Sequence, residues 1–233
     1  MKVNTPAKVL VIVAHPDDEI IGCGGTMVRH VQEGDVVDVL FLAEGVTARD
    51  SNCDLVARAA DIELRESAAC AAAAKVGVRS VTFHRSPDNR SDQVPLIEWA
   101  KLVEAAISKV KPDTVYTHHI GDLNIDHRRV HEAVMVACRP QPGHSVRRIF
   151  SFEVLSSTEW AAPSPATAFI PNRFVEITSQ LHSKEHALAC YGTELHDFPH
   201  PRSIEAVRAL SRYRGASAGF EAAEAFCVLR DLV

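Results

Sequence analysis

The sequence predicts an α/β protein in which a Rossmann-like, mostly parallel β-sheet lies between two layers of helices. Short apolar segments alternate with longer segments of helical periodicity over residues 8–140, which is the order expected of repeated β-α units. The apolar segments are rich in β-branched residues, and glycines follow several of the helical ones. We therefore expect a single domain over residues 1–233, with a three-layer α/β/α core at 1–140 and a C-terminal extension at 141–233.

The core is predicted to contain four strands, at residues 8–14, 36–42, 80–84 and 114–118. The first reads KVLVIVA, and such a continuous apolar run is typical of a strand that is buried on both faces of a parallel sheet. Helices are predicted at residues 24–33, 55–76, 95–110 and 126–138. Gly34 and Gly77 follow two of these helices, as glycine commonly does at a helix C-terminus. Pro95 suits the first turn of the third helix, and Pro140 follows the end of the fourth.

The C-terminal extension is less regular than the core. Strands are expected at residues 147–154 and 174–177, and helices at residues 183–191 and 204–213. The chain has six cysteines and no CxxC pair, and we expect reduced, mostly buried thiols rather than a disulfide framework. Three of them fall in helix-like stretches, namely Cys53, Cys70 and Cys138.

The composition is that of a soluble globular protein, with 46% hydrophobic and 24% charged residues. A net charge of −5 and a pI of about 6.2 argue against binding to a nucleic-acid backbone. The apolar run that ends at Ala14 is too short for a signal peptide, and no segment approaches the roughly 20 apolar residues that span a bilayer. We therefore expect a cytoplasmic protein with no nucleic-acid or membrane partner.

A cluster of ionisable side chains comes directly after the first predicted strand. It reads His15-Pro16-Asp17-Asp18-Glu19, and ligands of open α/β sheets bind beyond the carboxyl ends of the strands. Three neighbouring acids repel one another unless a cation neutralises them. A solvated acidic turn is the alternative interpretation, but the position at a strand end favours a metal site.

Glycines follow this cluster, in the segment Gly22-Cys23-Gly24-Gly25. A dinucleotide fingerprint would need a glycine at the sixth position from Gly22, where Met27 stands. We expect these glycines to let the backbone pass close beneath the site and to begin a helix.

A second cluster follows the fourth predicted strand and so opens onto the same edge of the sheet. Three histidines and two aspartates lie between His118 and His127, and His131 lies one helical turn further on. Arg128 stands where a zincin has its glutamate, which favours His127 as a metal ligand and His131 as a packing or supporting residue. Asp126, a candidate catalytic residue, either caps this helix or hydrogen-bonds a ring nitrogen of a ligand or catalytic histidine. The two clusters together supply a His/Asp/His set with one position left for water, which is typical of catalytic zinc.

With these residues in view, the sequence resembles the LmbE-like family, which includes the PIG-L deacetylases of N-acetylglucosaminyl lipids. The family's most specific motif, AHPDDE, stands at residues 14–19, and its second motif, HPDH, corresponds to Asn124-Ile125-Asp126-His127. The resemblance covers at least residues 8–140. It implies a hydrolase that deacetylates an N-acetylated amino sugar or sugar conjugate, with the extension at 141–233 shaping the substrate pocket. The roles of segments 156–160 and 199–203 stay open.

The resemblance also assigns roles to individual residues. It implies one Zn²⁺ per chain, held by His15, Asp18 and His127. Asp17 would then be the general base that later protonates the leaving amine. Whether iron replaces zinc in the cell stays open.

One residue departs from the family pattern, because Asn124 replaces the histidine that is thought to stabilise the oxyanion. An asparagine donates a hydrogen bond but supplies neither a positive charge nor a proton. This role therefore falls to Asn124, to His118 or His119, or to zinc alone. Candidates for binding the substrate are Arg65, Asp88, Arg90, His118 and His119.

Two other functions are left open by the sequence. One is the metal-dependent hydrolysis of a different amide or an ester, and the other is a non-catalytic module that binds a sugar or a nucleotide. The expected partner in each case is a small molecule. The sequence does not decide whether the chain forms a homo-oligomer.

Overall fold

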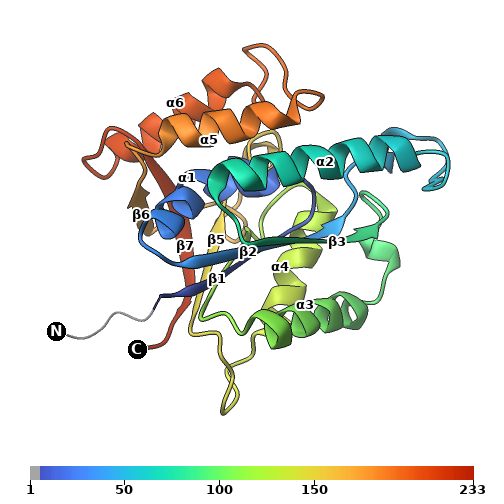
Figure 1. Cartoon of the computed structure of the whole chain (residues 1–233), viewed down its shortest axis with the longest axis horizontal. Coiled ribbons are helices and arrows are strands. Elements are labelled where there is room, and N and C mark those ends of the chain that lie inside the picture. Colours follow the sequence, from blue (N-terminus) through green and yellow to red (C-terminus); the bar gives the residue numbers. More distant parts are fainter. Residues whose placement is uncertain (1–5) are drawn as a thin grey trace.

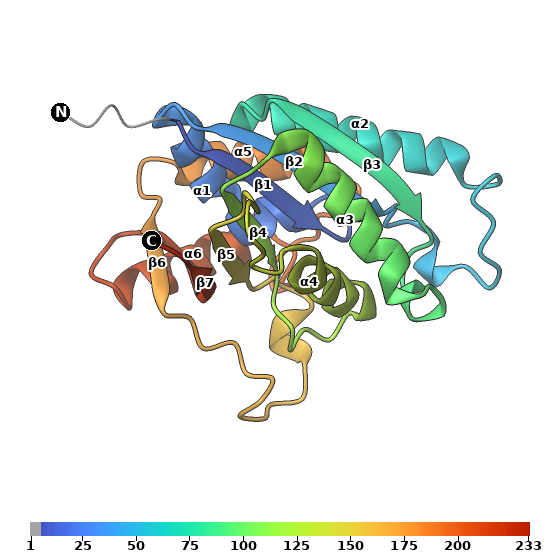
Figure 2. The same ribbon diagram turned by 90° about the horizontal axis from the view of Figure 1, so that it is seen from below.

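The computed structural model describes residues 6–233, in which a seven-stranded sheet lies between two layers of helices (Figures 1 and 2). The strands are β1 Lys8–Val13, β2 Val36–Ala43, β3 Ser80–Ser86, β4 Thr114–His118, β5 Arg148–Phe152, β6 Arg173–Glu176 and β7 Ala223–Asp231. The helices are α1 Asp18–Gln32, α2 Ala59–Val76, α3 Leu96–Val110, α4 Ile125–Ala137, α5 Leu181–Leu188 and α6 Ile204–Ala216. The predicted α/β class is therefore confirmed.

The strand order is β3-β2-β1-β4-β5-β7-β6, and the pairs from β3 to β5 are all parallel. Only β7 runs opposite to the other strands, so the sheet is mostly parallel, as predicted. The chain moves outward from β1 to β3 and then returns to place β4 against the free edge of β1. Ligand sites of open α/β sheets form at such a reversal of strand order.

Alternate residues of β1 face the two helical layers, which explains why almost the whole strand is apolar. Val9, Val11 and Val13 pack with buried residues of α1, α2, α5 and α6. Leu10 and Ile12 pack with buried residues of α3 and α4 on the opposite face. Figure 1 shows the same division, with α3 and α4 on one side of the sheet and the other helices on the other side. Among residues 6–233, no helix combines the length and apolarity that crossing a bilayer requires.

The structure corrects several predicted boundaries. Helix α1 begins at Asp18 rather than at residue 24; its first two turns contain Gly22, Gly24 and Gly25, whose low helix propensity favours a loop. Helix α2 begins at Ala59, and the residues before it form turns. Strand β7 was not predicted; its segment AEAFCVLRD has a short apolar run at residues 225–229 flanked by charged residues and shows no clear alternation.

The expectation of mostly buried thiols is wrong. Only Cys23 and Cys138 are buried, whereas Cys70 is exposed and the other three are partly exposed. Cys53 also lies outside any helix, in the turns that precede α2. Ala-rich α2 packs through its small residues, so the polar face that carries Cys70 stays at the surface.

The glycines of α1 allow this helix to pack closely against the C-terminal half of the chain. A β-carbon on Gly22 would overlap the ring of Phe152, which ends β5. A β-carbon on Gly25 would lie 2.8 Å from the side chain of Ile177, just after β6. The helix is also kinked between these two glycines, at Cys23, whose φ and ψ are −145° and 22°. The prediction that these glycines permit a close approach of the backbone is confirmed.

A buried ion pair from the C-terminal extension supplies hydrogen-bond partners to the backbone groups that the kink leaves unpaired. In an unbroken helix the Gly25 N–H would donate to the Ile21 carbonyl. Here the Ile21 carbonyl accepts from Lys184 Nζ at 2.8 Å, and Gly25 N–H donates to Glu224 Oε1 at 2.9 Å. Lys184 and Glu224 also contact each other at 2.7 Å, and both are buried. The extension thereby holds α1, and with it the loop that precedes α1.

We predict that Glu224→Ala lowers the free energy of unfolding by about 3–5 kcal/mol, because it leaves a buried lysine and two helix N–H groups unpaired. Urea denaturation measures the change. Glu33→Ala is the matched control, since Glu33 is half-exposed and pairs with Arg29 on the same helix; its effect should stay within about 1 kcal/mol. Equal, small losses in both variants would contradict this role of Glu224.

Candidate metal centre and active site

The candidate site lies where the carboxyl ends of β1 and β4 meet. His15 follows β1 and leads through a short turn into α1, whose first residue is Asp18. His127 lies in the first turn of α4, which follows β4 after a loop. Residues 112 positions apart therefore share one edge of the sheet, as the sequence predicts for its two clusters of ionisable residues.

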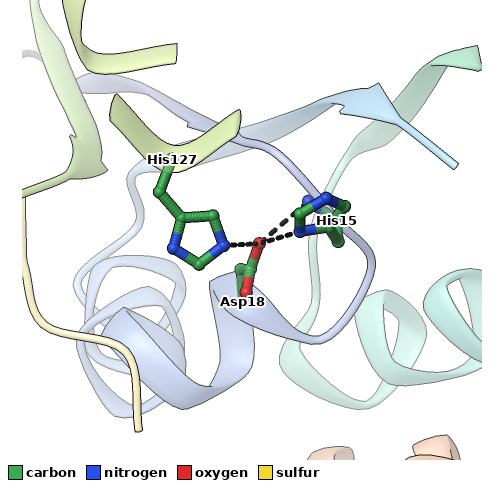
Figure 3. Close-up of side chains that lie close together, drawn as sticks. All are labelled: His15, Asp18 and His127. Carbon is green, nitrogen blue, oxygen red and sulfur yellow. Dashed lines mark hydrogen bonds and ion pairs between the residues drawn. The ribbon is translucent and has the colours of Figure 1, made fainter. Parts of the chain in front are cut away.

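Both imidazoles point at the same carboxylate (Figure 3). His15 Nδ1 lies 3.3 Å from Asp18 Oδ2, and His127 Nε2 lies 3.2 Å from the same oxygen. One ligand atom from each of the three residues falls within 4.8 Å of the others, and all three side chains are buried. The structure thus brings together the three predicted ligands.

The charges of the cluster suit a cation. Burial raises the pKa of Asp18, but His127 and His15 outweigh it and hold that pKa well below its usual value. Burial lowers the pKa of His127, and Asp18 and Asp122 reverse this and raise it to about 9. Asp18 Oδ1 is buried without a hydrogen-bond partner among the described residues, and the ring nitrogens of His127 contact only the carboxylates of Asp18 and Asp122. Two imidazoles and one carboxylate match the donors of catalytic zinc, so the residues fit the metal.

Further carboxylates stand behind both histidines. His15 Nε2 lies 3.1 Å from Asp126 and 3.0 Å from Asp88. His127 Nδ1 lies 3.2 Å from Asp122. Carboxylates on the far nitrogen of a ligand histidine fix its tautomer and orientation. The predicted contact of Asp126 with a ligand histidine is therefore present.

A second set of possible ligands shares His15. Its Nε2 and one oxygen each of Asp88 and Asp126 also lie within 4.8 Å of one another. Asp126 is already engaged, because its carboxylate accepts from the N–H groups of Asn89 at 2.7 Å and Ser91 at 3.2 Å. The first set, with its unpaired atoms, is therefore the better metal site.

Asp122 was not singled out by the sequence analysis. Its carboxylate accepts hydrogen bonds from the hydroxyls of Ser157 and Thr158, the latter at 2.6 Å. Segment 156–160, whose role the sequence left open, thus supports the carboxylate that faces His127. The sequence feature that could have pointed to Asp122 is the presence of two aspartates between His118 and His127.

Asp17 is held beside the metal set without belonging to it. Arg202 and Arg65 donate to its Oδ2, at 3.0 and 3.2 Å, whereas its Oδ1 is buried without a partner. Burial raises the pKa of Asp17 more than the two arginines lower it. Its φ of 113° lies in the left-handed region, which costs a non-glycine residue of order 1–3 kcal/mol and often marks a functional site.

Arg202 comes from segment 199–203, whose role the sequence also left open. It donates to Ser156 Oγ at 2.7 Å and lies near Glu194, which also pairs with Arg65. Nothing in the local pattern predicts that a residue 185 positions away would reach Asp17.

Asp126 does not cap α4, so the first of its two predicted roles is not the one observed. Asn124 is the N-cap, and its Oδ1 accepts from the N–H of Asp126 at 2.8 Å. Asp126 lies inside the helix, where its carboxylate reaches His15. Asparagine is among the best N-cap residues, which explains why Asn124 rather than Asp126 caps the helix.

His118 and His119 do not reach the cavity beside the metal set. His118 Nε2 accepts from the N–H of Ala14 at 2.8 Å, and its ring stacks on His127 with centroids 3.9 Å apart. Burial, followed by nearby His127, holds the pKa of His118 well below its usual value. His119 Nε2 lies 3.0 Å from the carbonyl of Thr167. His131 Nδ1 donates to the carbonyl of His118 at 2.8 Å, which is the packing role expected of it.

A cavity of about 490 Å³ opens beside His15 and is lined by Arg65, Asp88 and Asn124, among others. Arg90 does not line it. Pockets that hold small molecules commonly have volumes of about 300–1,000 Å³. Several lining residues belong to the C-terminal extension, namely Ser156, Trp160, Thr193, Glu194, His196, His200 and Arg202.

Comparison with known proteins places the chain in a family. The model of the family described as PIG-L, GlcNAc-PI de-N-acetylase, matches residues 10–138, more than half of the sequence. The chain belongs to the PIG-L family. It is accordingly a member of a family of hydrolytic N-deacetylases, as the resemblance implied.

Two curated relatives and one solved structure illustrate this membership. The uncharacterized deacetylase YaiS of Escherichia coli is 27% identical over 182 residues, covering 76% of this chain and 85% of YaiS. The 1D-myo-inositol 2-acetamido-2-deoxy-alpha-D-glucopyranoside deacetylase of Kineococcus radiotolerans is 27% identical over 165 residues, or 58% of this chain and 46% of that protein. The N,N'-diacetylchitobiose deacetylase of Pyrococcus horikoshii shares the fold, with a TM-score of 0.77, 20% identity, and 96% and 84% of the two chains covered.

We predict that zinc affinity rises with pH up to about 9. In the metal-free PIG-L site, the pKa of His127 is raised to about 9 and that of His15 is also raised, so both rings carry protons at neutral pH. Zinc must displace these protons, which weakens binding by about tenfold per pH unit for each proton released. Chelator competition at pH 6, 7 and 8 measures the effect. A pH-independent affinity would contradict the assignment.

His127→Ala should abolish this binding, whereas His131→Ala, one helical turn further along α4, should retain it.

Proposed function

We propose that this chain is a zinc-dependent hydrolase that removes the acetyl group from an N-acetylated amino sugar or sugar conjugate. The observation that carries the proposal is the buried set of His15, Asp18 and His127, of which His15 lines the cavity, together with the free Oδ1 of neighbouring Asp17. Three protein ligands leave a coordination position for water or substrate, as catalytic zinc requires. We propose one zinc ion per chain.

The substrate class is supported by the family and its members. The family description names a GlcNAc derivative, and the Kineococcus and Pyrococcus proteins are named as deacetylases of an acetamido-glucopyranoside and of diacetylchitobiose. Each of these compounds carries an acetamido group on a sugar ring. A cavity of about 490 Å³ lined by both polar and apolar side chains is suitable for a sugar of this kind.

Asp17 is the proposed general base. Zinc held by the three ligands would lower the pKa of water toward ~7 and polarise the acetyl carbonyl. Arg65 and Arg202 hold Asp17 through Oδ2, so Oδ1 is the oxygen left to take a proton from the attacking water. The same carboxyl then returns the proton to the sugar nitrogen as the C–N bond breaks.

Asn124 is the proposed hydrogen-bond donor to the developing oxyanion. Its Oδ1 is committed to the N–H of Asp126, and this bond fixes the orientation of the amide. Its Nδ2 donates to no residue among 6–233, and the side chain lines the cavity. A neutral donor in this position stabilises the oxyanion without supplying a proton. Asp88 and Arg65 line the same cavity and are the proposed contacts for sugar hydroxyls.

The first test of the reaction is an amine-release assay. We expect the zinc-loaded protein to release a primary amine from N-acetyl sugars, and a chelator to abolish the release. A panel containing simple acetamides and acetate esters distinguishes a sugar deacetylase from a hydrolase of broader specificity. A protein that binds the sugars but releases no amine would instead be a non-catalytic binding module, and this result would contradict the proposal.

We predict that Asp17→Asn retains zinc and lowers kcat by about 10²–10⁴-fold, because an amide cannot accept the proton. Zinc content by elemental analysis and kcat are measured on the same sample. Asp92→Asn, an exposed substitution of the same kind, serves as the control and should leave kcat unchanged. Loss of zinc together with activity would mean that Asp17 is a ligand and not the base.

A further inference from the structure

Positively charged side chains gather around the cavity, although the chain as a whole has a net charge of −5. They come from two regions far apart in sequence. One is residues 47–65, which cover the short helix Thr47–Arg49, the turns before α2 and the start of α2, and the other is the loop 192–203 before α6. The basic side chains that line the cavity apart from His15 are Arg49, Arg58, Arg65, His196, His200 and Arg202.

The arginines of this group differ in whether a carboxylate neutralises them. Arg58 pairs with Asp50 and Asp61, and Arg65 and Arg202 share Asp17 and Glu194. Arg49 forms no ion pair with any carboxylate in the part of the chain that the structure describes. Its guanidinium is exposed and lines the cavity.

Two histidines complete this side of the cavity. The rings of His196 and His200 lie 4.2 Å apart, centroid to centroid. His200 Nδ1 accepts from the N–H of Arg202 at 3.0 Å, so the proton of the neutral ring is on Nε2, which is left as a donor. Burial lowers the pKa of His200, and nearby His196, Arg202 and Arg49 lower it further against the opposing effect of Glu159.

We propose that Arg49 and His200 form a subsite for an anionic group, a phosphate or a carboxylate, that the acetylated substrate carries. The inference rests on the proposed function, since it concerns the same cavity. A guanidinium and a ring N–H are the donors that bind such oxyanions through charge-assisted hydrogen bonds. The acids that line the cavity are already paired, Asp61 and Glu194 with arginines and Asp88 with His15, so an anion meets little uncompensated negative charge.

The test compares three substrates: a neutral methyl glycoside of N-acetylglucosamine, N-acetylglucosamine 1-phosphate, and a glycoside of N-acetylglucosamine whose aglycone ends in a carboxylate. We expect kcat/KM to be at least about tenfold higher for one or both anionic compounds, and the preference to shrink at high salt. The anionic compound with the higher kcat/KM identifies phosphate or carboxylate as the preferred group. Equal kcat/KM for all three compounds would overturn the proposal.

The variant Arg49→Gln should reduce the ratio of anionic to neutral kcat/KM by about five- to tenfold. Arg212→Gln is the control, because Arg212 is exposed on α6 and does not line the cavity. It should leave the ratio unchanged. An unchanged ratio in Arg49→Gln as well would overturn the assignment of Arg49.

A binding measurement separates this inference from the proposed function. Glucosamine 1-phosphate lacks the acetyl group, so calorimetry measures its binding without turnover. We expect it to bind the wild-type protein at least about fivefold more tightly than Arg49→Gln. If that difference appears but no amine is released from any substrate, the subsite stands and the deacetylase proposal fails. If amine is released without any preference for the anion, the deacetylase stands and the subsite fails.

Discussion

The buried carboxylate of Asp18 is the feature on which the rest of the site depends. A charged carboxylate in a protein interior is costly unless opposite charges or hydrogen bonds compensate for it. Here two imidazoles, one from the turn after β1 and one from the first turn of α4, point at it, and a further carboxylate contacts the far nitrogen of each. The result is a layered arrangement in which acids and histidines alternate outward from one point. A divalent cation at the centre would satisfy the atoms that are left without partners.

The C-terminal extension completes what the parallel strands begin. The core strands bring His15 and His127 to one edge of the sheet, but they supply neither the arginine that reaches Asp17 from loop 192–203 nor the hydroxyls that hold Asp122. Lys184 and Glu224 restore the hydrogen bonds that the kink in α1 breaks. Two neighbouring aspartates consequently lie in different surroundings, Asp18 among histidines and Asp17 among arginines. In the proposed mechanism, this difference in surroundings would let Asp18 bind the metal while Asp17 accepts and returns protons.

Much of the core could be predicted from the sequence, because local patterns determine it. The continuous apolar run of β1 and the residues of β4 match the structure closely, since strands covered on both faces have few alternatives. Strand β7 was missed, because an antiparallel strand near the sheet edge is partly exposed and its pattern is mixed. The sequence could suggest the three proposed metal ligands because they lie in two short motifs after strands, and the structure places these three residues together. Arg202 and Asp122 could not be assigned, because their contacts depend on how distant segments pack. Asp126 was given two roles, and only the packed structure shows that Asn124 takes the capping role.

The most direct test of this account is a crystal structure of the zinc-loaded protein with anomalous data collected at the zinc absorption edge. The account predicts a single strong anomalous peak per chain, contacted by His15 Nδ1, an oxygen of Asp18 and His127 Nε2, with Asp122 and Asp126 still on the far nitrogens of the two rings. A peak that His15 shares with Asp88 and Asp126 instead, or a His127 ring turned away from the metal, would contradict it.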